Sequence, residues 1–231
     1  LVGDEQRLHF EQLKKTLELM EFPKAKDYNF ETFGMVRFPE GKMSSRTGKN
    51  ILYSEFFEEV KGIALTGLKD RGSLHKDLES KAEKIAIAAI KYSMLKQDSK
   101  KSIIFDPSEA ISFEGDTGPY LLYSYARASS IKNKVESKKG VKILDLKEQE
   151  IKLLKKINSF PEIVEKAHNQ KSPNLIANYS FELCKLFNEF YHSCPVLGSP
   201  EEGFRLKLVE SFRITIKKAL DLLGIDVLEE M

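Results

Sequence analysis

The sequence has few cysteines, no long apolar run and no segment that resembles a secretion signal. Its two cysteines, Cys184 and Cys194, would lie about 15 Å apart on one helix, too far for a disulfide. They leave no second pair for a zinc site, so we expect reduced, partly buried thiols. No apolar run reaches the roughly 18 residues of a transmembrane helix. The first residues, LVGDEQRLHF, lack the basic start and apolar core of a signal peptide. These absences predict a cytoplasmic protein without a membrane partner.

Composition and charge are ordinary for a globular protein. Of the 231 residues, 31% are charged and 41% are hydrophobic, which is enough for a substantial core in one or two domains. The net charge of +2 does not by itself indicate nucleic-acid binding. Lysines cluster at residues 96–101 and 132–142, where they could meet a phosphate backbone or form a solvated face. The sequence lacks an initiator methionine, and its first residues already belong to a structural pattern that would start earlier, so we expect a piece of a longer protein.

Apolar periodicity indicates a small α/β part followed by a helical part. In the first part we expect a helix from Asp4 to about Met20, strands at 30–38 and 50–53, helices at about 54–69 and 74–97, and an extended segment at 103–107. After Thr117 we expect four helices. The first spans about 118–138, the second starts at a capping box of Asp145 and Glu148, the third starts at Ser172–Pro173, and the fourth runs from about Ser199 to Gly224.

The α/β part has too few strands for a complete doubly wound sheet. We therefore expect a mainly α protein, in which the remnant of a Rossmann-like α/β domain precedes an α-helical bundle. The expected domains are residues 1–110 and 111–231.

The loop PEGKMSSRTG at residues 39–48 combines glycines, hydroxyls and cations in a short space. Gly41 and Gly48 allow the backbone to approach a ligand closely. The hydroxyls can bond to phosphate oxygens, and Lys42 and Arg46 supply positive charge. Such a loop suits a pyrophosphate that gains charge as it leaves, although an arbitrary loop of this composition would more often be a solvated basic surface.

The order K-M-S-S-R at residues 42–46 resembles the KMSKS loop of class I aminoacyl-tRNA synthetases, and its arginine followed by x-Gly is most similar to the arginyl enzymes. The segment FEGDTGPYLLYSYAR at 113–127 resembles the junction between that family's catalytic body and its anticodon-binding domain. Residues from about Asn178 to Met231 are similar to the family's C-terminal helical domain, and VGDEQRLHF at 2–10 resembles the end of its catalytic domain. The resemblance covers the whole chain in the family's order.

The resemblance implies the C-terminal portion of an arginine–tRNA ligase, which uses ATP with Mg²⁺ to join arginine to its tRNA and has no tightly bound cofactor. The implied catalytic residues are Lys42, Ser44 and Arg46, and the implied ATP-binding residues are His9, Lys42, Met43, Ser44 and Ser45. Gln6 would contact the substrate arginine. Without the resemblance, Gln6 would be a surface residue and His9 a structural histidine.

A second group of candidate residues lies on the helix that we expect to start at residue 118. Tyr120, Tyr123 and Arg127 follow at i, i+3 and i+7, and such a stripe can stack unpaired bases. The alternative is that the tyrosines are core residues with satisfied hydroxyls. The resemblance implies contact with the tRNA anticodon and adds Met231. Apolar residues of the next helix are expected to be bundle core without another function: Phe181, Leu183, Leu186, Phe187, Phe190 and Tyr191.

The main departure from the family is that no histidine lies in an H-x-G-H motif. The half of the active site that carries this motif is missing, so we expect the chain alone to be inactive and to need an N-terminal catalytic half. The other expected partners are arginine-specific tRNA, arginine and ATP, with a monomeric state. A non-catalytic tRNA-binding helical module, a helical interaction domain without nucleic acid, and a C-terminus like that of cysteinyl synthetases remain alternatives.

Overall fold

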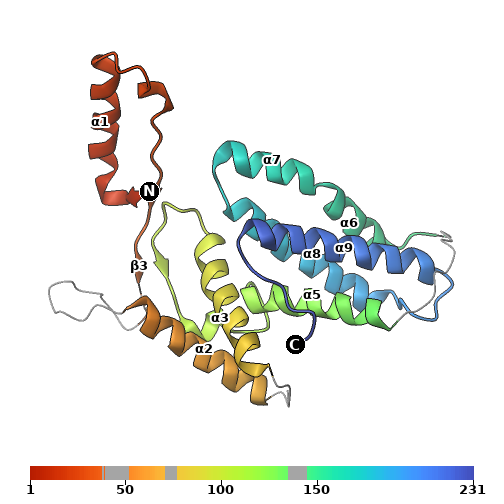
Figure 1. Ribbon diagram of the computed structural model, residues 1–231. Coiled ribbons are helices and arrows are strands. Elements are labelled where there is room, and N and C mark those ends of the chain that lie inside the picture. The colour runs from red at the N-terminus through yellow and green to blue at the C-terminus, as the bar shows by residue number, and fades with distance from the viewer. Residues whose placement is uncertain (38, 40–51, 71–76, 135–144) are drawn as a thin grey trace. The chain divides into compact units, whose positions relative to one another are not determined.

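The computed structural model describes residues 1–37, 39, 52–70, 77–134 and 145–231, which belong to two compact units (Figure 1). The small unit comprises Leu1–Asn50 and Gln97–Asp106, and the helical unit comprises Ile51–Lys96 and Pro107–Met231. The described residues are mostly helical with a few very short strands, which confirms the predicted fold class. The functional division between residues 110 and 111 stays a prediction.

Short parallel strand pairs organise the small unit. Its elements are β1 (Val2–Gly3), the 3₁₀ helix η1 (Asp4–Gln6), α1 (Arg7–Leu19), the 3₁₀ helix η2 (Ala25–Asp27), β2 (Thr32–Phe33), β3 (Val36–Arg37) and β4 (Ile103–Ile104). β1 pairs with β2, and β3 pairs with β4.

Two sequence predictions for the small unit need correction. The predicted strand at 30–38 is two strands with different partners, and it is interrupted at Gly34, where a side chain would overlap the backbone carbonyl of Lys101. The first helix does not begin at Asp4. The Asp4 carboxylate instead pairs with Arg7, so a single 3₁₀ turn precedes α1.

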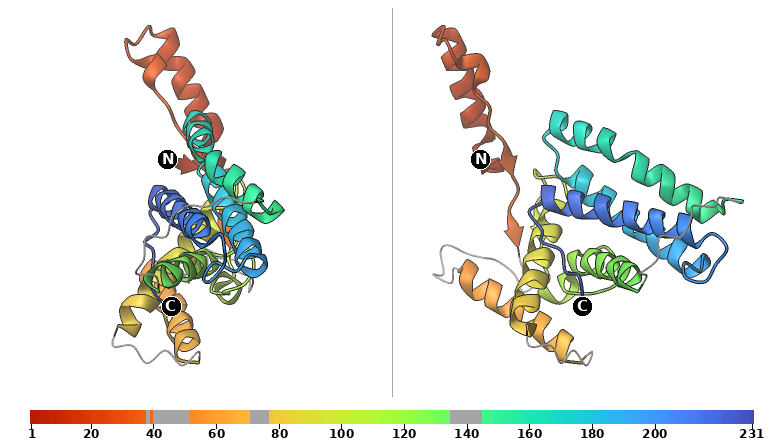
Figure 2. Two further views of the ribbon diagram at one scale, coloured as in Figure 1. Left: turned by 90° about the vertical axis from the view of Figure 1, so that its right-hand side faces the viewer. Right: turned by 45° about the vertical axis from the view of Figure 1, so that its right-hand side comes forward.

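The helical unit is a set of packed helices that cross or run beside one another (Figure 2). They are α2 (Tyr53–Asp70), α3 (Leu78–Leu95), α4 (Pro107–Ala110), α5 (Gly118–Asn133), α6 (Glu148–Asn158), α7 (Phe160–Gln170), α8 (Asn174–Ser193) and α9 (Glu202–Leu222). α5 packs against α3, α8 and α9, and α8 also packs against α6 and α7. The predicted strand at 50–53 is wrong at Tyr53, because this residue already begins α2.

The region after residue 145 differs from the single helix expected there. Two helices, α6 and α7, meet at Ser159, and Pro161 lies in the first turn of α7, where its missing N–H breaks no helical bond. The start of α6 also differs. The carboxylate of Glu150 accepts from the backbone N–H of Lys147 at 2.7 Å, so the expected capping box of Asp145 and Glu148 is wrong.

Aromatic side chains fill the core between α5, α8 and α9. The rings of Phe187 and Phe212 stack with their centroids 3.9 Å apart. Cys184 and Cys194 are free and fully buried, so they are thiols as predicted, and more deeply buried than expected. Of the expected core residues on α8, Phe181 and Leu186 are only half-buried, and Tyr191 is 39% exposed. This packing fixes the adjacent surfaces of α5 and α8.

Candidate functional site

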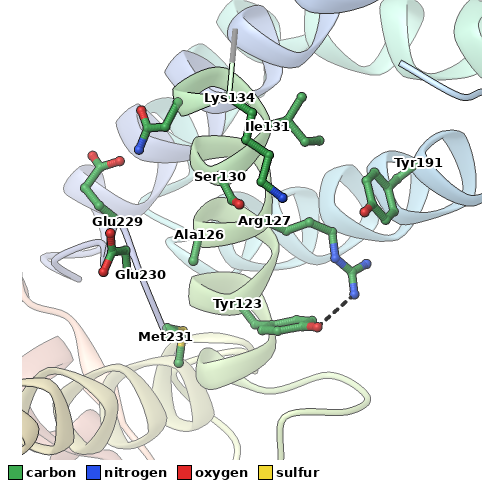
Figure 3. A pocket seen from close by; sticks show the side chains of 11 residues that line it. Tyr123, Ala126, Arg127, Ser130, Ile131, Lys134, Tyr191, Glu229, Glu230 and Met231 are labelled. Atoms are coloured by element: carbon green, nitrogen blue, oxygen red, sulfur yellow. Dashed lines mark hydrogen bonds between the residues drawn. The ribbon is translucent and has the colours of Figure 1, made fainter. Parts of the chain in front are cut away.

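A pocket of about 530 Å³ lies on the helical unit, at the C-terminal half of α5 (Figure 3). One wall is a face of α5, the second is Tyr191 of α8, and the third is the segment that follows α9. Its lining residues are Tyr123, Ala126, Arg127, Ser130, Ile131, Asn133, Lys134, Tyr191, Glu229, Glu230 and Met231. Residues from three distant parts of the sequence therefore meet in one pocket.

The guanidinium of Arg127 is held between two aromatic rings. Its carbon lies 4.7 Å from the ring centroid of Tyr123 and 5.0 Å from that of Tyr191. One terminal nitrogen donates to the Tyr123 hydroxyl at 3.0 Å, and the other donates to the side-chain oxygen of Asn188. Cation–π contacts and charge-assisted hydrogen bonds both favour this geometry. Arg127 is thus fixed in place and fixes the Tyr123 ring with it.

Asn188 of α8 connects this stack to the rest of α5. Its amide nitrogen donates to the Tyr120 hydroxyl at 2.9 Å and to the Ser124 hydroxyl at 3.0 Å. Tyr120 also packs its ring against Phe181, with the centroids 5.8 Å apart, and burial raises the pKa of its hydroxyl. Tyr120 therefore lies in the contact between α5 and α8 rather than in the pocket wall.

The pocket has both charges and an aromatic surface. Arg127 and Lys134 carry positive charge, whereas Glu229 and Glu230 carry negative charge. Half-exposed tyrosine rings can stack on an unpaired base, lysine can approach a phosphate, and carboxylates can accept hydrogen bonds from base amino groups. The arrangement suits a single-stranded nucleic acid better than an apolar small molecule.

The other residues that the sequence suggested lie apart from this pocket. Gln6 ends η1 and is exposed, and His9 is exposed on α1 with its ring at right angles to that of Phe10. The suggested loop residues, which are Lys42, Met43, Ser44, Ser45 and Arg46, lie outside the described residues. Of the suggested anticodon residues, the pocket brings together Tyr123, Arg127 and Met231 and leaves out Tyr120.

The sequence interpretation missed several residues of the pocket. Tyr191 was expected in the core together with Phe187, which is indeed fully buried. Asn188 was not singled out, although a polar residue between Phe187 and Phe190 on a core-facing helix is an available signal. Glu229 and Glu230 gave no sequence signal, since isolated acidic residues near a terminus are common.

Two negative findings apply to the part of the chain that the structure describes. No three His, Cys, Asp or Glu side chains there come together as a metal site would require. Among those same residues, no helix is both long and apolar enough to span a bilayer.

Two family models match the chain. The model for the catalytic domain of class I (R) tRNA synthetases matches residues 1–107, and the model for the DALR anticodon binding domain matches residues 121–231. The pocket lies within the second match.

Curated relatives and solved structures agree with these matches. The arginine–tRNA ligases of Clostridium acetobutylicum and Flavobacterium psychrophilum are each 39% identical to the chain; the alignments cover 100% of it and 42% and 40% of the relatives. The structure of Thermus thermophilus arginyl-tRNA synthetase matches with a TM-score of 0.87 at 33% identity, over 94% of this chain and 38% of that one. The chain thus spans about two fifths of the length of these proteins.

Proposed function

Because the chain belongs to the arginyl-tRNA synthetase family and corresponds to its C-terminal part, we propose that it acts within an arginine–tRNA ligase and binds the anticodon loop of arginine tRNA. The observation that carries this proposal is the pocket that contains Tyr123, Arg127, Tyr191 and Met231. It lies in the residues that match the anticodon-binding model, and its chemistry suits unpaired bases.

In this proposal the tyrosines stack on bases and the charged groups select among them. The guanidinium of Arg127 already contacts the Tyr123 and Tyr191 rings, so an incoming base stacks on an exposed ring face without first ordering these side chains. Lys134 is placed to meet a phosphate of the loop. Stacking on one aromatic side chain is worth about 1–3 kcal/mol per base.

The catalytic part of the proposal concerns residues outside the pocket. Lys42, Ser44 and Arg46 act on the ATP phosphates, with Met43 and Ser45 shaping the loop, while Gln6 contacts arginine and His9 lies near the adenine. Mg²⁺ would be held mainly by the ATP phosphates, as is usual at sites that act on nucleotides. The ligase would act as a cytoplasmic monomer that includes the rest of the catalytic domain.

The experiment measures binding of the chain to arginine tRNA and to an unrelated tRNA across a salt series. The variants are Tyr123→Ala and Tyr191→Ala, with Tyr53→Ala as the control, because Tyr53 is an exposed tyrosine of α2 outside the pocket. We expect tighter binding to arginine tRNA. Each pocket variant should weaken it by about 5- to 150-fold, the equivalent of one lost stacking contact, and the control should not.

The proposed anticodon role would be overturned if both tRNAs bound equally tightly and the pocket variants left their affinities unchanged. A separate measurement addresses catalysis. When the chain is joined to the rest of the catalytic domain, ATP–pyrophosphate exchange that depends on Lys42 supports the ligase. Exchange that is absent in this enzyme would instead favour a non-catalytic tRNA-binding module.

A further inference from the structure

The segment that follows α9, residues 224–231, reaches the pocket because it is tied to the helical unit along its length. Ile225 and Leu228 are buried, and Met231 lines the pocket. A segment beyond the last helix is expected to move freely unless specific contacts hold it. We call residues 224–231 the post-α9 segment.

Near its end, the post-α9 segment is held by polar contacts of Glu229. The hydroxyl of Tyr125, which lies in the core on α5, donates to the Glu229 carboxylate at 2.7 Å. A guanidinium nitrogen of Arg213 on α9 lies 3.6 Å from the same carboxylate oxygen and donates to the Tyr125 hydroxyl at 3.0 Å. Partial burial opposes the charge on Glu229, yet nearby hydroxyls, including that of Tyr125, and Arg213 outweigh it and lower the pKa of Glu229.

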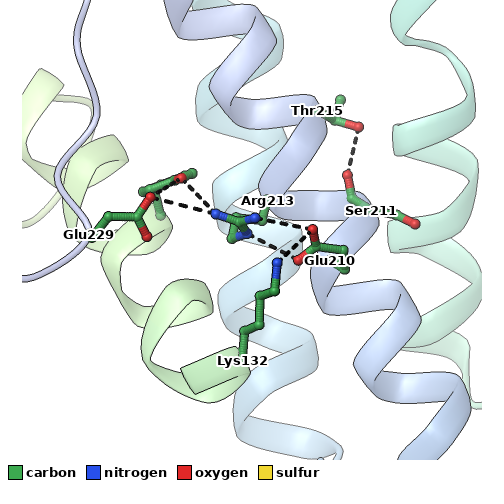
Figure 4. A network of polar contacts seen from close by, with 7 residues as sticks. Lys132, Glu210, Ser211, Arg213, Thr215 and Glu229 are labelled. Atoms are coloured by element: carbon green, nitrogen blue, oxygen red, sulfur yellow. Dashed lines mark hydrogen bonds and ion pairs between the residues drawn. The ribbon is translucent and has the colours of Figure 1, made fainter. Parts of the chain in front are cut away.

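Arg213 is itself held in position from its other side (Figure 4). Two of its nitrogens donate to the two carboxylate oxygens of Glu210, both at 3.1 Å, and Lys132 of α5 pairs with Glu210 at 3.1 Å. Such a bidentate pair fixes the plane of the guanidinium as well as its position. The chain of contacts runs from Lys132 through Glu210 and Arg213 to Glu229, and so joins α5, α9 and the post-α9 segment.

The beginning of the post-α9 segment is held separately by α3. Lys91 donates to the backbone carbonyl of Gly224, and Lys84 lies 4.0 Å from the carboxylate of Asp226. Gly224 has a φ of 66°, which turns the chain away from the axis of α9. These contacts set the direction in which the post-α9 segment leaves α9. The contacts of Glu229 lie only two residues from Met231 and therefore act closest to the pocket.

We infer that Tyr125 and Arg213 are positioning residues of the anticodon site, which hold Glu229 and thereby keep Met231 at the pocket. The effect on tRNA rests on the proposed function, whereas the position of Met231 can be measured without tRNA. Neither residue lines the pocket, so both act through the post-α9 segment.

The first measurement follows the side chain of Met231 directly. In protein labelled with ¹³C at the methionine methyl groups, Met231→Leu identifies the Met231 signal among the five methionines. Tyr125→Phe keeps the buried ring and removes only its hydroxyl, and Arg213→Leu removes the cation without adding a methionine. Both variants should move the Met231 signal to the shift of a free methionine and sharpen it, while Lys218→Leu, at an exposed position of α9, should leave it unchanged.

The second measurement is discrimination, meaning the ratio of affinities for arginine tRNA and an unrelated tRNA. Tyr125→Phe and Met231→Ala should each lower this ratio by about tenfold. The double variant should lower it no further than either single variant, because both substitutions remove the same contact, that of Met231 with the tRNA. Circular dichroism checks that each variant is folded; if Arg213→Leu is not folded, Tyr125→Phe decides.

Each result is decisive. A Met231 signal that does not change in the folded Tyr125→Phe protein overturns the inference. A signal that changes while discrimination persists also overturns it, because the position of Met231 would then not matter to the site. A wild-type chain that fails to discriminate between the tRNAs refutes the proposed function instead, and the methyl signal still reports whether Tyr125 and Arg213 hold the segment.

Discussion

Removing the cation of Arg205 should destabilise the helical unit strongly, because it leaves a buried carboxylate without its partner. The Arg205 and Glu150 side chains join α9 to α6 at 2.7 Å, and only 4% and 1% of their surfaces are exposed. Arg205 also donates to the Pro195 carbonyl at 2.8 Å and pairs with Glu201 at 3.4 Å. Breaking such a buried pair typically costs about 3–5 kcal/mol, and we expect Arg205→Met to fall in this range.

A second ion pair on α6 provides a matched control at the same distance. Lys152 lies 2.7 Å from Glu148, but 51% and 72% of these side chains are exposed, so solvent screens the pair. Lys152→Met should therefore change the free energy of unfolding by no more than the experimental error. The double variant Glu150→Leu/Arg205→Met should recover part of the loss, since it leaves no buried charge.

The assay is urea unfolding followed by circular dichroism, with thermal unfolding as a second measure. A loss of about 3–5 kcal/mol lowers the midpoint temperature by about 6–20 °C for a unit of this size. If Arg205→Met were no more destabilising than Lys152→Met, the argument that burial decides the strength of this pair would be wrong.

Two further predictions concern packing and the thiols. Gly118→Ala should destabilise the protein by about 1–3 kcal/mol in urea unfolding, because the new Cβ would overlap the Ala88 carbonyl where α3 meets α5. Gly62→Ala, in open space on α2, should instead stabilise the protein by up to about 1 kcal/mol. If the two substitutions changed the free energy of unfolding equally, the close packing of Gly118 against α3 would be contradicted. Burial raises the pKa of the Cys184 and Cys194 thiols, so both should react with a thiol reagent at pH 8 only after unfolding. Rapid labelling of the native chain would count against their burial.

The sequence predicted the helices well because their information is local. Apolar spacing, the proline at residue 173 and the glycine at 224 lie beside the helix ends that they mark. The start of α8 and both ends of α9 lie within a few residues of the prediction. The start of α6 was missed because its capping carboxylate, Glu150, is set by a partner on α9. A residue at such a position cannot be identified without knowing which helices pack together.

The candidate site was partly predictable for the same reason. Tyr123 and Arg127 share a helical stripe, so their proximity follows from helix geometry alone. Tyr120 belongs to the same stripe, but Asn188 on α8 binds its hydroxyl in the helix contact. The contribution of Tyr191 depends on the packing of α8 against α5, which periodicity does not encode.

The measurement that tests the central claim most directly is a transplant of the anticodon loop. An unrelated tRNA receives the anticodon loop of arginine tRNA and is compared with its parent for binding to the wild-type chain and to Tyr123→Ala. The account predicts that the transplanted tRNA binds the wild-type chain nearly as tightly as arginine tRNA and loses this gain with Tyr123→Ala. No gain from the transplanted loop, or a gain that Tyr123→Ala leaves intact, would contradict the claim that this pocket binds the anticodon.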